Sequence, residues 1–161
     1  MKHIIAVMVE NKPGVLARIV GLISGRGFNI DSLNVAPTQD PTISRMTIQV
    51  LGDDRVLEQV TKQLNKLIDV FKVSDLTTEK FVDRELIIVK VAVPGDKRAE
   101  AGKLAERMKA QIVSEQRDSL VLEMTGDQKR INEFIGLLDG FKILDMSRSG
   151  VIAVGKADSN S

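Results

Sequence analysis

The chain has 161 residues, and its 23 basic and 22 acidic side chains leave a formal charge of +1. This balance argues against a nucleic-acid-binding surface, which needs a surplus of basic charge, and against a polybasic membrane anchor. Cysteine is absent and His3 is the only histidine, which excludes disulfides and thiolate catalysis and argues against a multi-histidine metal site or a Ser-His-Asp triad.

Apolar residues make up 43% of the chain, which is enough for a folded core. No apolar run approaches the roughly 18 residues that a membrane-spanning helix needs. We therefore expect a cytoplasmic protein without membrane contact, built as one ordinary domain or as two small domains of roughly 80 residues each.

The first 76 residues alternate between strand and helix patterns. His3–Val9 is almost wholly apolar, which is typical of a strand buried on both faces. We predict that this strand forms a dimer interface. Asn11 is placed to cap the following helix and Pro13 to occupy its first turn. Further strands are predicted at 29–35, 42–51 and 70–75, with a second helix beginning at 52–53.

The same order of elements follows in the second half. Residues 77–83 are mostly polar and predict a linker. Strands are then predicted at 85–93, 111–116, 120–125 and 141–154, the last with a bulge at 149–150, and helices at 94–108 and from 126–127 onward. The fold class is therefore α+β, with two ferredoxin-like βαββαβ sandwiches at 2–76 and 84–155 and a flexible tail at 156–161.

The segment from Asn11 to Leu16 is the most informative one for function. It joins a strand to the start of a helix, where free backbone N–H groups and the positive end of the helix dipole converge. Gly14 lets a ligand approach the backbone, and Asn11 offers both a donor and an acceptor. The segment therefore suits a small carboxylate. The alternative is that these residues only cap, start and pack the helix.

The other candidate groups favour structural roles. Asp53 and Asp54 stand at a predicted helix start, where carboxylates act as caps. His3 lies on a strand and is expected to be a packing or surface residue. The sequence thus offers no catalytic residue and no metal site.

Three stretches of the first half carry a family resemblance. They are NKPGVLARIVGLISGRGFNIDSLNVAPTQDP at 11–41, SRMTIQV at 44–50 and VLEQVTKQLNKLIDVFKV at 56–73. Together they resemble the ACT domain of the small regulatory subunits of acetolactate synthase. RELIIVKV at 84–91 and SRSGV at 147–151 extend the likeness, more thinly, into the second half.

The resemblance implies an effector site shared between two copies of an ACT domain at residues 2–76. Asn11, Gly14 and Val15 would come from one copy, and Asn29 and Ile30 from the other. The two asparagines would hold the ammonium and carboxylate groups of a small amino acid, usually valine in this family. The backbone N–H groups of Gly14 and Val15 would complete the carboxylate cage.

The resemblance also implies a role without catalysis by this chain. It would form a homodimer, activate a large catalytic subunit and confer feedback inhibition by valine in branched-chain amino acid biosynthesis. Thiamine diphosphate, Mg²⁺ and FAD would belong to that partner, and this chain would carry no cofactor. The alternative function is a free-standing ACT-domain amino-acid sensor or transcriptional regulator. Co-purification with a thiamine-dependent partner, against retention on DNA, would separate the two.

Overall fold

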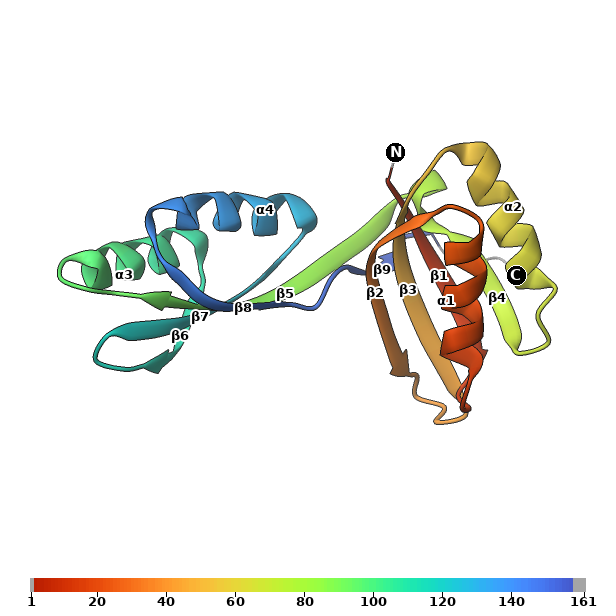
Figure 1. Ribbon diagram of the computed structural model, residues 1–161, viewed down its shortest axis with the longest axis horizontal. Helices are drawn as coiled ribbons and strands as arrows, with labels where there is room; N and C mark the ends of the chain where they lie inside the picture. Colours follow the sequence, from red (N-terminus) through yellow and green to blue (C-terminus); the bar gives the residue numbers. More distant parts are fainter. Residues whose placement is uncertain (1, 158–161) are drawn as a thin grey trace. The chain divides into compact units, whose positions relative to one another are not determined.

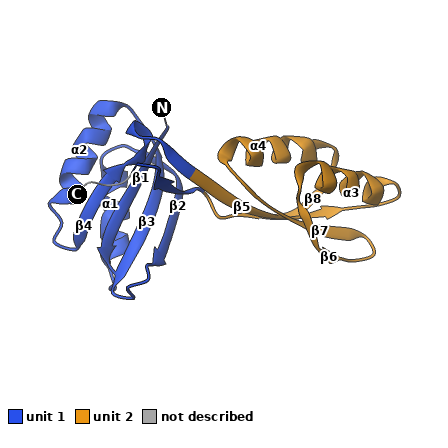
Figure 2. Ribbon diagram, turned by 180° about the vertical axis from the view of Figure 1, so that it is seen from behind, with its two compact units in different colours: residues 1–82, 151–161 blue, residues 83–150 orange. Residues whose placement is uncertain are grey.

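The computed structural model describes residues 2–157 and divides the chain into two compact units. Unit 1 contains the residues up to 82 together with those from 151 onward, and unit 2 contains residues 83–150 (Figure 2). Residues 77–83, predicted as a linker, are structured, because they contain most of the short helix η1 (Leu76–Thr78) and the start of the long strand β5 (Phe81–Ala92). Of the predicted tail, residues 158–161 lie outside the described part of the chain.

Unit 1 is built on a four-stranded antiparallel sheet with the strand order β2-β3-β1-β4 (Figure 1). Its strands are β1 (Lys2–Glu10), β2 (Asn29–Pro37), β3 (Ile43–Leu51) and β4 (Val70–Asp75). Helices α1 (Val15–Gly25) and α2 (Asp54–Asn65) pack on one face of this sheet. The order of elements is therefore the predicted βαββαβ.

Side chains along each strand point alternately to the two faces of the sheet, and those on the helix side form the core of unit 1. Ile5 and Val7 on β1 and Ile48 on β3 point to the helices and are fully buried. They meet Ile19 of α1 and Leu64 of α2, which are also fully buried. Burial of each such side chain stabilises the fold by about 1.5–3 kcal/mol.

The other apolar face of β1 is covered by the same chain. Ile4 and Ala6 pack in a second buried cluster with Leu76, Val151 and Ala153. In addition, β1 is an inner strand, hydrogen-bonded to β3 on one side and β4 on the other. The prediction that His3–Val9 forms a dimer interface is therefore wrong: the strand is apolar on both faces because segments distant in sequence cover it.

Polar side chains fasten the returning C-terminal segment to the sheet. The Arg45 guanidinium donates to the Ala153 carbonyl oxygen at 2.8 Å, and the Asn34 amide donates to that of Val151 at 3.0 Å. Both side chains belong to the face opposite the helices. This face of the sheet is thus partly covered by the chain itself.

Unit 2 repeats the βαββαβ order with the sheet order β6-β7-β5-β8. Its further elements are α3 (Lys97–Met108), β6 (Gln111–Glu115), β7 (Ser119–Gly126), α4 (Gln128–Leu137), η2 (Leu138–Gly140) and β8 (Ile143–Arg148). Fully buried Phe134 of α4 packs with Ile87 and Leu122 of the sheet. The predicted α+β class with two ferredoxin-like sandwiches is confirmed.

The last predicted strand, 141–154, is two strands in the structure. The backbone N–H of Ser149 donates to the Leu86 carbonyl oxygen at 2.9 Å, and its hydroxyl accepts from the Leu86 N–H at 2.9 Å. Gly150 then adopts φ +75°, in the left-handed region that favours glycine. The chain leaves unit 2 at this point, and β9 (Ile152–Gly155) belongs to unit 1.

Candidate functional site

The turn between β1 and α1 lies where the sequence predicted it, but the helix begins later than expected. Gly14 adopts φ +86°, which explains why glycine stands there, and it lies just before the helix rather than in its first turn. The first helical hydrogen bond runs from the Arg18 N–H to the Gly14 carbonyl oxygen at 3.1 Å. A Cβ atom added at Gly14 would meet nothing within 4 Å, so the approach to the start of α1 is open in the described chain.

Asn11 does not cap α1, contrary to prediction. Its side-chain amide donates to the Pro41 carbonyl oxygen at 2.9 Å, and its backbone N–H donates to that of Thr42 at 2.8 Å. These two bonds tie the turn to the loop between β2 and β3. Pro13 precedes the helix instead of occupying its first turn.

The start of α1 is electrostatically different from those of the other helices. Asp53 caps α2 by accepting from the Val56 N–H at 2.9 Å, and Asp127 caps α4 in the same way. Glu100 stands in the first turn of α3. Within the described residues, α1 has neither a side-chain cap nor an acidic residue in its first turn. Its partial positive charge is therefore available to an external carboxylate.

A cluster of charged side chains lies next to this turn. The Asp69 carboxylate is almost fully buried, and its two oxygens lie 2.9 Å from Lys12 Nζ and 2.5 Å from an Arg18 guanidinium nitrogen. Lys12 also pairs with Glu10 at 2.9 Å. The side-chain hydrogen bond from Lys12 is the main cause that lowers the pKa of Asp69, while bonds to Glu10 and then Asp69 raise the pKa of Lys12.

No pattern in the sequence singles out this cluster. Asp69 lies more than 50 residues from Lys12 and Arg18, and it stands alone between a helix end and β4. The Glu10 N–H bonded to the Asp69 carbonyl oxygen at 2.9 Å brings the segments together. The contact of Asp69 with Lys12 and Arg18 follows from the pairing of β1 with β4. The register of that pairing cannot be obtained from a single sequence.

The five residues implied by the resemblance form two groups within one chain. Asn11, Gly14 and Val15 lie together, but the Val15 side chain is buried in the core, so only its backbone N–H faces outward from the helix start. Asn29 is exposed at the start of β2, where it pairs with Leu51.

The second group lies at the far end of the sheet. Ile30, the neighbour of Asn29, is half-buried against the core. Along β1 the register runs from Lys2 opposite Leu51 to Glu10 opposite Ile43. Eight residues of strand span roughly 26 Å, so one chain does not bring Asn29 and Asn11 together.

The remaining candidates behave as follows. Asp53 caps α2, as predicted, and His3 is buried beneath the start of that helix. Over residues 2–157, no group of three or more His, Cys, Asp or Glu side chains is arranged to hold a metal ion. None of the helices described in that range is long and apolar enough to cross a membrane.

Comparisons with known protein families show to which class each half of the chain belongs. Residues 5–72 match the family described as "AHAS small subunit-like ACT domain", and residues 84–157 match "Small subunit of acetolactate synthase". The first unit is therefore an ACT domain, and the second half matches a domain of the same subunit. These two matches cover most of the described chain.

Whole-chain relatives identify the family. A "Probable acetolactate synthase small subunit" from Archaeoglobus fulgidus is 51% identical over 154 residues, covering 96% of each chain. The "Acetolactate synthase small subunit" of Haemophilus influenzae is 44% identical over 161 residues, covering 99% of each. A crystal structure of the Thermotoga maritima small subunit matches with a TM-score of 0.89 at 33% identity, covering 98% of this chain and 99% of that one. The chain belongs to the family of acetolactate synthase small subunits.

Proposed function

We propose that this chain is the regulatory subunit of a cytoplasmic acetolactate synthase. It binds a large catalytic subunit, raises its activity and makes it sensitive to valine. Thiamine diphosphate, Mg²⁺ and FAD belong to that partner, which condenses pyruvate with pyruvate or with 2-oxobutyrate. The supporting facts are the membership of the family and matches that extend over both halves of the chain.

The valine site lies at the turn before α1. The observation that carries this assignment is the open, uncapped helix start behind Gly14. The valine carboxylate accepts from the N–H groups of Gly14 and Val15, at the positive end of α1. Asn11, fixed by its bond to Pro41, stands beside them.

A second copy of the chain completes the site through β2. This strand is an edge of the unit 1 sheet, so one row of its backbone groups is free to pair. In an antiparallel pair of β2 strands, the start of one strand lies beside the end of the other. That end adjoins the turn at Asn11, because Pro37 pairs with Ser44 and Glu10 with Ile43. The partner's Asn29 and Ile30 then reach the site that one chain leaves incomplete.

Valine inhibits through linkage. A ligand shifts an equilibrium only by its difference in affinity for the two states, so valine must bind the inhibited holoenzyme more tightly than the active one. Unit 2 is the element that responds in this scheme.

Calorimetry with a panel of amino acids tests the function directly. We expect saturable heat with valine for the full chain and, after addition of the large subunit, inhibition of acetolactate formation over the same concentration range. Equilibrium sedimentation of the chain should show a dimer at micromolar concentration. Binding to DNA instead of a large subunit would overturn the proposal in favour of a transcriptional regulator.

A further inference from the structure

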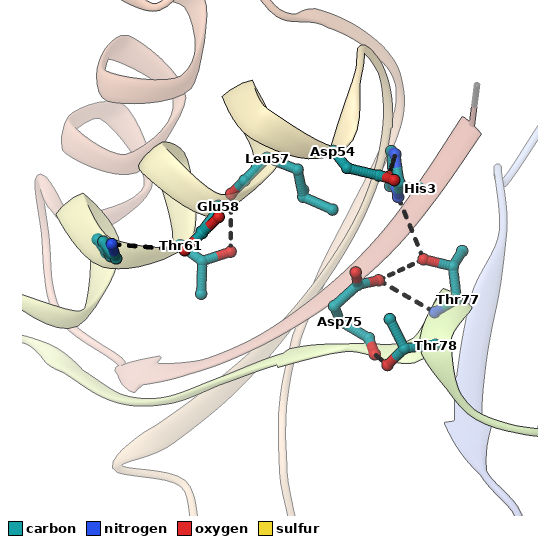
Figure 3. A pocket seen from close by; sticks show the side chains of 9 residues that line it. His3, Asp54, Leu57, Glu58, Thr61, Asp75, Thr77 and Thr78 are labelled. Atoms are coloured by element: carbon teal, nitrogen blue, oxygen red, sulfur yellow. Dashed lines mark hydrogen bonds and ion pairs between the residues drawn. The ribbon is translucent and has the colours of Figure 1, made fainter.

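A pocket lies in unit 1, away from the turn before α1. It is a cavity of about 520 Å³ between α2 and the junction of β4 with η1. Figure 3 shows Asp54, Leu57 and Glu58 on one side of it and Asp75 and Thr77 on the other. His3, which also lines it, stands near the start of β1, whereas the valine site follows the end of that strand.

A chain of hydrogen bonds selects one tautomer of the neutral His3 imidazole. One Asp75 carboxylate oxygen accepts from the Thr77 N–H at 3.1 Å and from the Thr77 hydroxyl. The hydroxyl proton is thus engaged, so Thr77 Oγ1 acts as the acceptor toward His3 Nδ1 at 3.2 Å. The neutral imidazole therefore carries its proton on Nδ1, and Nε2 presents a lone pair.

That lone pair has no donor. The His3 side chain is 4% exposed, and no described residue gives Nε2 a hydrogen bond. Its neighbour is Asp54 Oδ1 at 3.4 Å, which is also only an acceptor. In the neutral form of His3, two acceptors thus face each other without a proton between them, at the edge of a cavity. A buried acceptor left in this state is costly, and a donor that serves both groups removes the cost.

The rest of the pocket indicates which donor fits. Asp54, Glu58 and Asp75 are three carboxylates, against one lysine, Lys62, which already pairs with Glu58 at 3.4 Å. The site therefore favours a cation. Leu57 supplies apolar lining, which a cation with a hydrocarbon body would cover.

We propose that this pocket binds a small alkylammonium ion. Its N–H groups donate to His3 Nε2 and to the Asp54 carboxylate, and its alkyl chain packs against Leu57. The Asp54 side chain is 80% exposed, so it can turn outward to admit the ligand nitrogen. A free amino acid fits less well, because its carboxylate would meet the carboxylates of the pocket. The site is thus distinct in chemistry from the proposed valine site.

The single histidine provides a direct readout for the full chain. In a long-range ¹H–¹⁵N NMR spectrum at neutral pH, we expect one imidazole with the proton on Nδ1. Titration with n-butylammonium chloride should shift the Nε2 resonance in a saturable way. Asp54→Asn should weaken this binding at least tenfold, whereas the control Asp139→Asn, an exposed aspartate in unit 2, should leave it unchanged.

Two further probes separate the contributions. Tetramethylammonium has the charge without N–H groups, and n-butanol has the chain without the charge, so each should bind at least tenfold more weakly. Thr77→Val removes the acceptor at Nδ1 and should move the imidazole proton to Nε2, with loss of n-butylammonium binding.

Specific results would overturn the assignment. These are equal binding of tetramethylammonium, the absence of any saturable shift, or a free protein whose His3 is already doubly protonated at neutral pH. In the last case a proton on His3 Nε2, and not a ligand, would bridge His3 and Asp54. None of these results bears on valine binding, which is measured separately by calorimetry.

Discussion

The two halves of the chain contain the same turn in different electrical surroundings. Pro13–Gly14 precedes α1, and Pro94–Gly95 leads to α3. Both glycines have positive φ, +86° and +58°, and neither would meet an atom within 4 Å if it gained a Cβ. A Pro-Gly turn with positive φ therefore recurs between a strand and a helix, although Gly14 is the N-cap residue of α1 and Gly95 precedes the N-cap residue of α3.

The residues that follow the glycine make the difference. α3 has Asp96 at its N-cap position and Glu100 in its first turn, so its own carboxylates lie near its positive end. α1 continues with Val15 and Leu16 and has no acidic residue there. The first turn of α3 thus has carboxylates of its own chain beside it, whereas the first turn of α1 has none. A helix start is a candidate anion site when no acidic residue or side-chain cap of its own chain lies beside it.

The largest expected effect comes from placing a carboxylate in the open turn. Gly14→Asp would put a like charge about 4 Å from the valine carboxylate, and at an effective dielectric near 20 this repulsion is about 4 kcal/mol. Even half of it would weaken valine inhibition roughly thirtyfold. The positive φ adds strain of roughly 1–2 kcal/mol to the fold. A valine titration of the reconstituted holoenzyme measures the effect.

Gly95→Asp is the matched control for that variant. It introduces the same side chain at a glycine of positive φ, so it should lower the unfolding temperature to a similar extent. It should leave the valine titration unchanged. Equal valine curves for Gly14→Asp and the unmutated protein would show that the turn before α1 is not the effector site.

The cluster around Asp69 gives the next effect, and it depends on pH. The pKa of Asp69 is lowered in the folded state, so the carboxylate stabilises the fold above its unfolded pKa of about 4, and this contribution is lost as pH falls through the folded value. Asp69→Asn should lower the unfolding temperature at pH 7 and flatten its dependence on pH below about pH 5. Calorimetric melting at several pH values tests this. Parallel curves for the two proteins would contradict it.

Asn11→Ala should have a smaller effect on stability. It removes the bond to the Pro41 carbonyl oxygen, which contributes about 1 kcal/mol, and it also removes a proposed valine contact. We expect roughly tenfold weaker valine binding by calorimetry. Asn132→Ala, an exposed change on α4, is the control and should leave binding unaltered.

The smallest effect belongs to the turn of unit 2. Lys97 Nζ lies 5.1 Å from the Phe141 ring centroid and 3.1 Å from a Glu100 carboxylate oxygen. Lys97→Met keeps the apolar stem and removes both interactions, which should lower the free energy of unfolding by about 0.5–1 kcal/mol. Urea denaturation measures it. Weaker valine binding by the isolated Lys97→Met chain would contradict the proposed division between the two turns.

The sequence by itself determined the order of the elements and the class of the fold. Period-two runs such as Met46, Ile48 and Val50 and the capping Asp53 are local signals, and local signals specify strands, helices and their boundaries. The resemblance carried by residues 11–41 identified the ACT domain, which comparison confirmed. The sequence also placed a turn at Pro13–Gly14, whereas the positive φ of Gly14 appears only in the structure.

Only the tertiary structure decided which faces and charges are covered. Residues 151–155 return to unit 1 and bury the second face of β1, so an apolar strand that suggested an interface lies inside one chain. Asp69 reaches Lys12 through the pairing of β1 with β4, and His3 reaches Thr77 across 74 residues. Such contacts depend on strand order and register, which follow from the packing of the whole sheet and not from any local pattern.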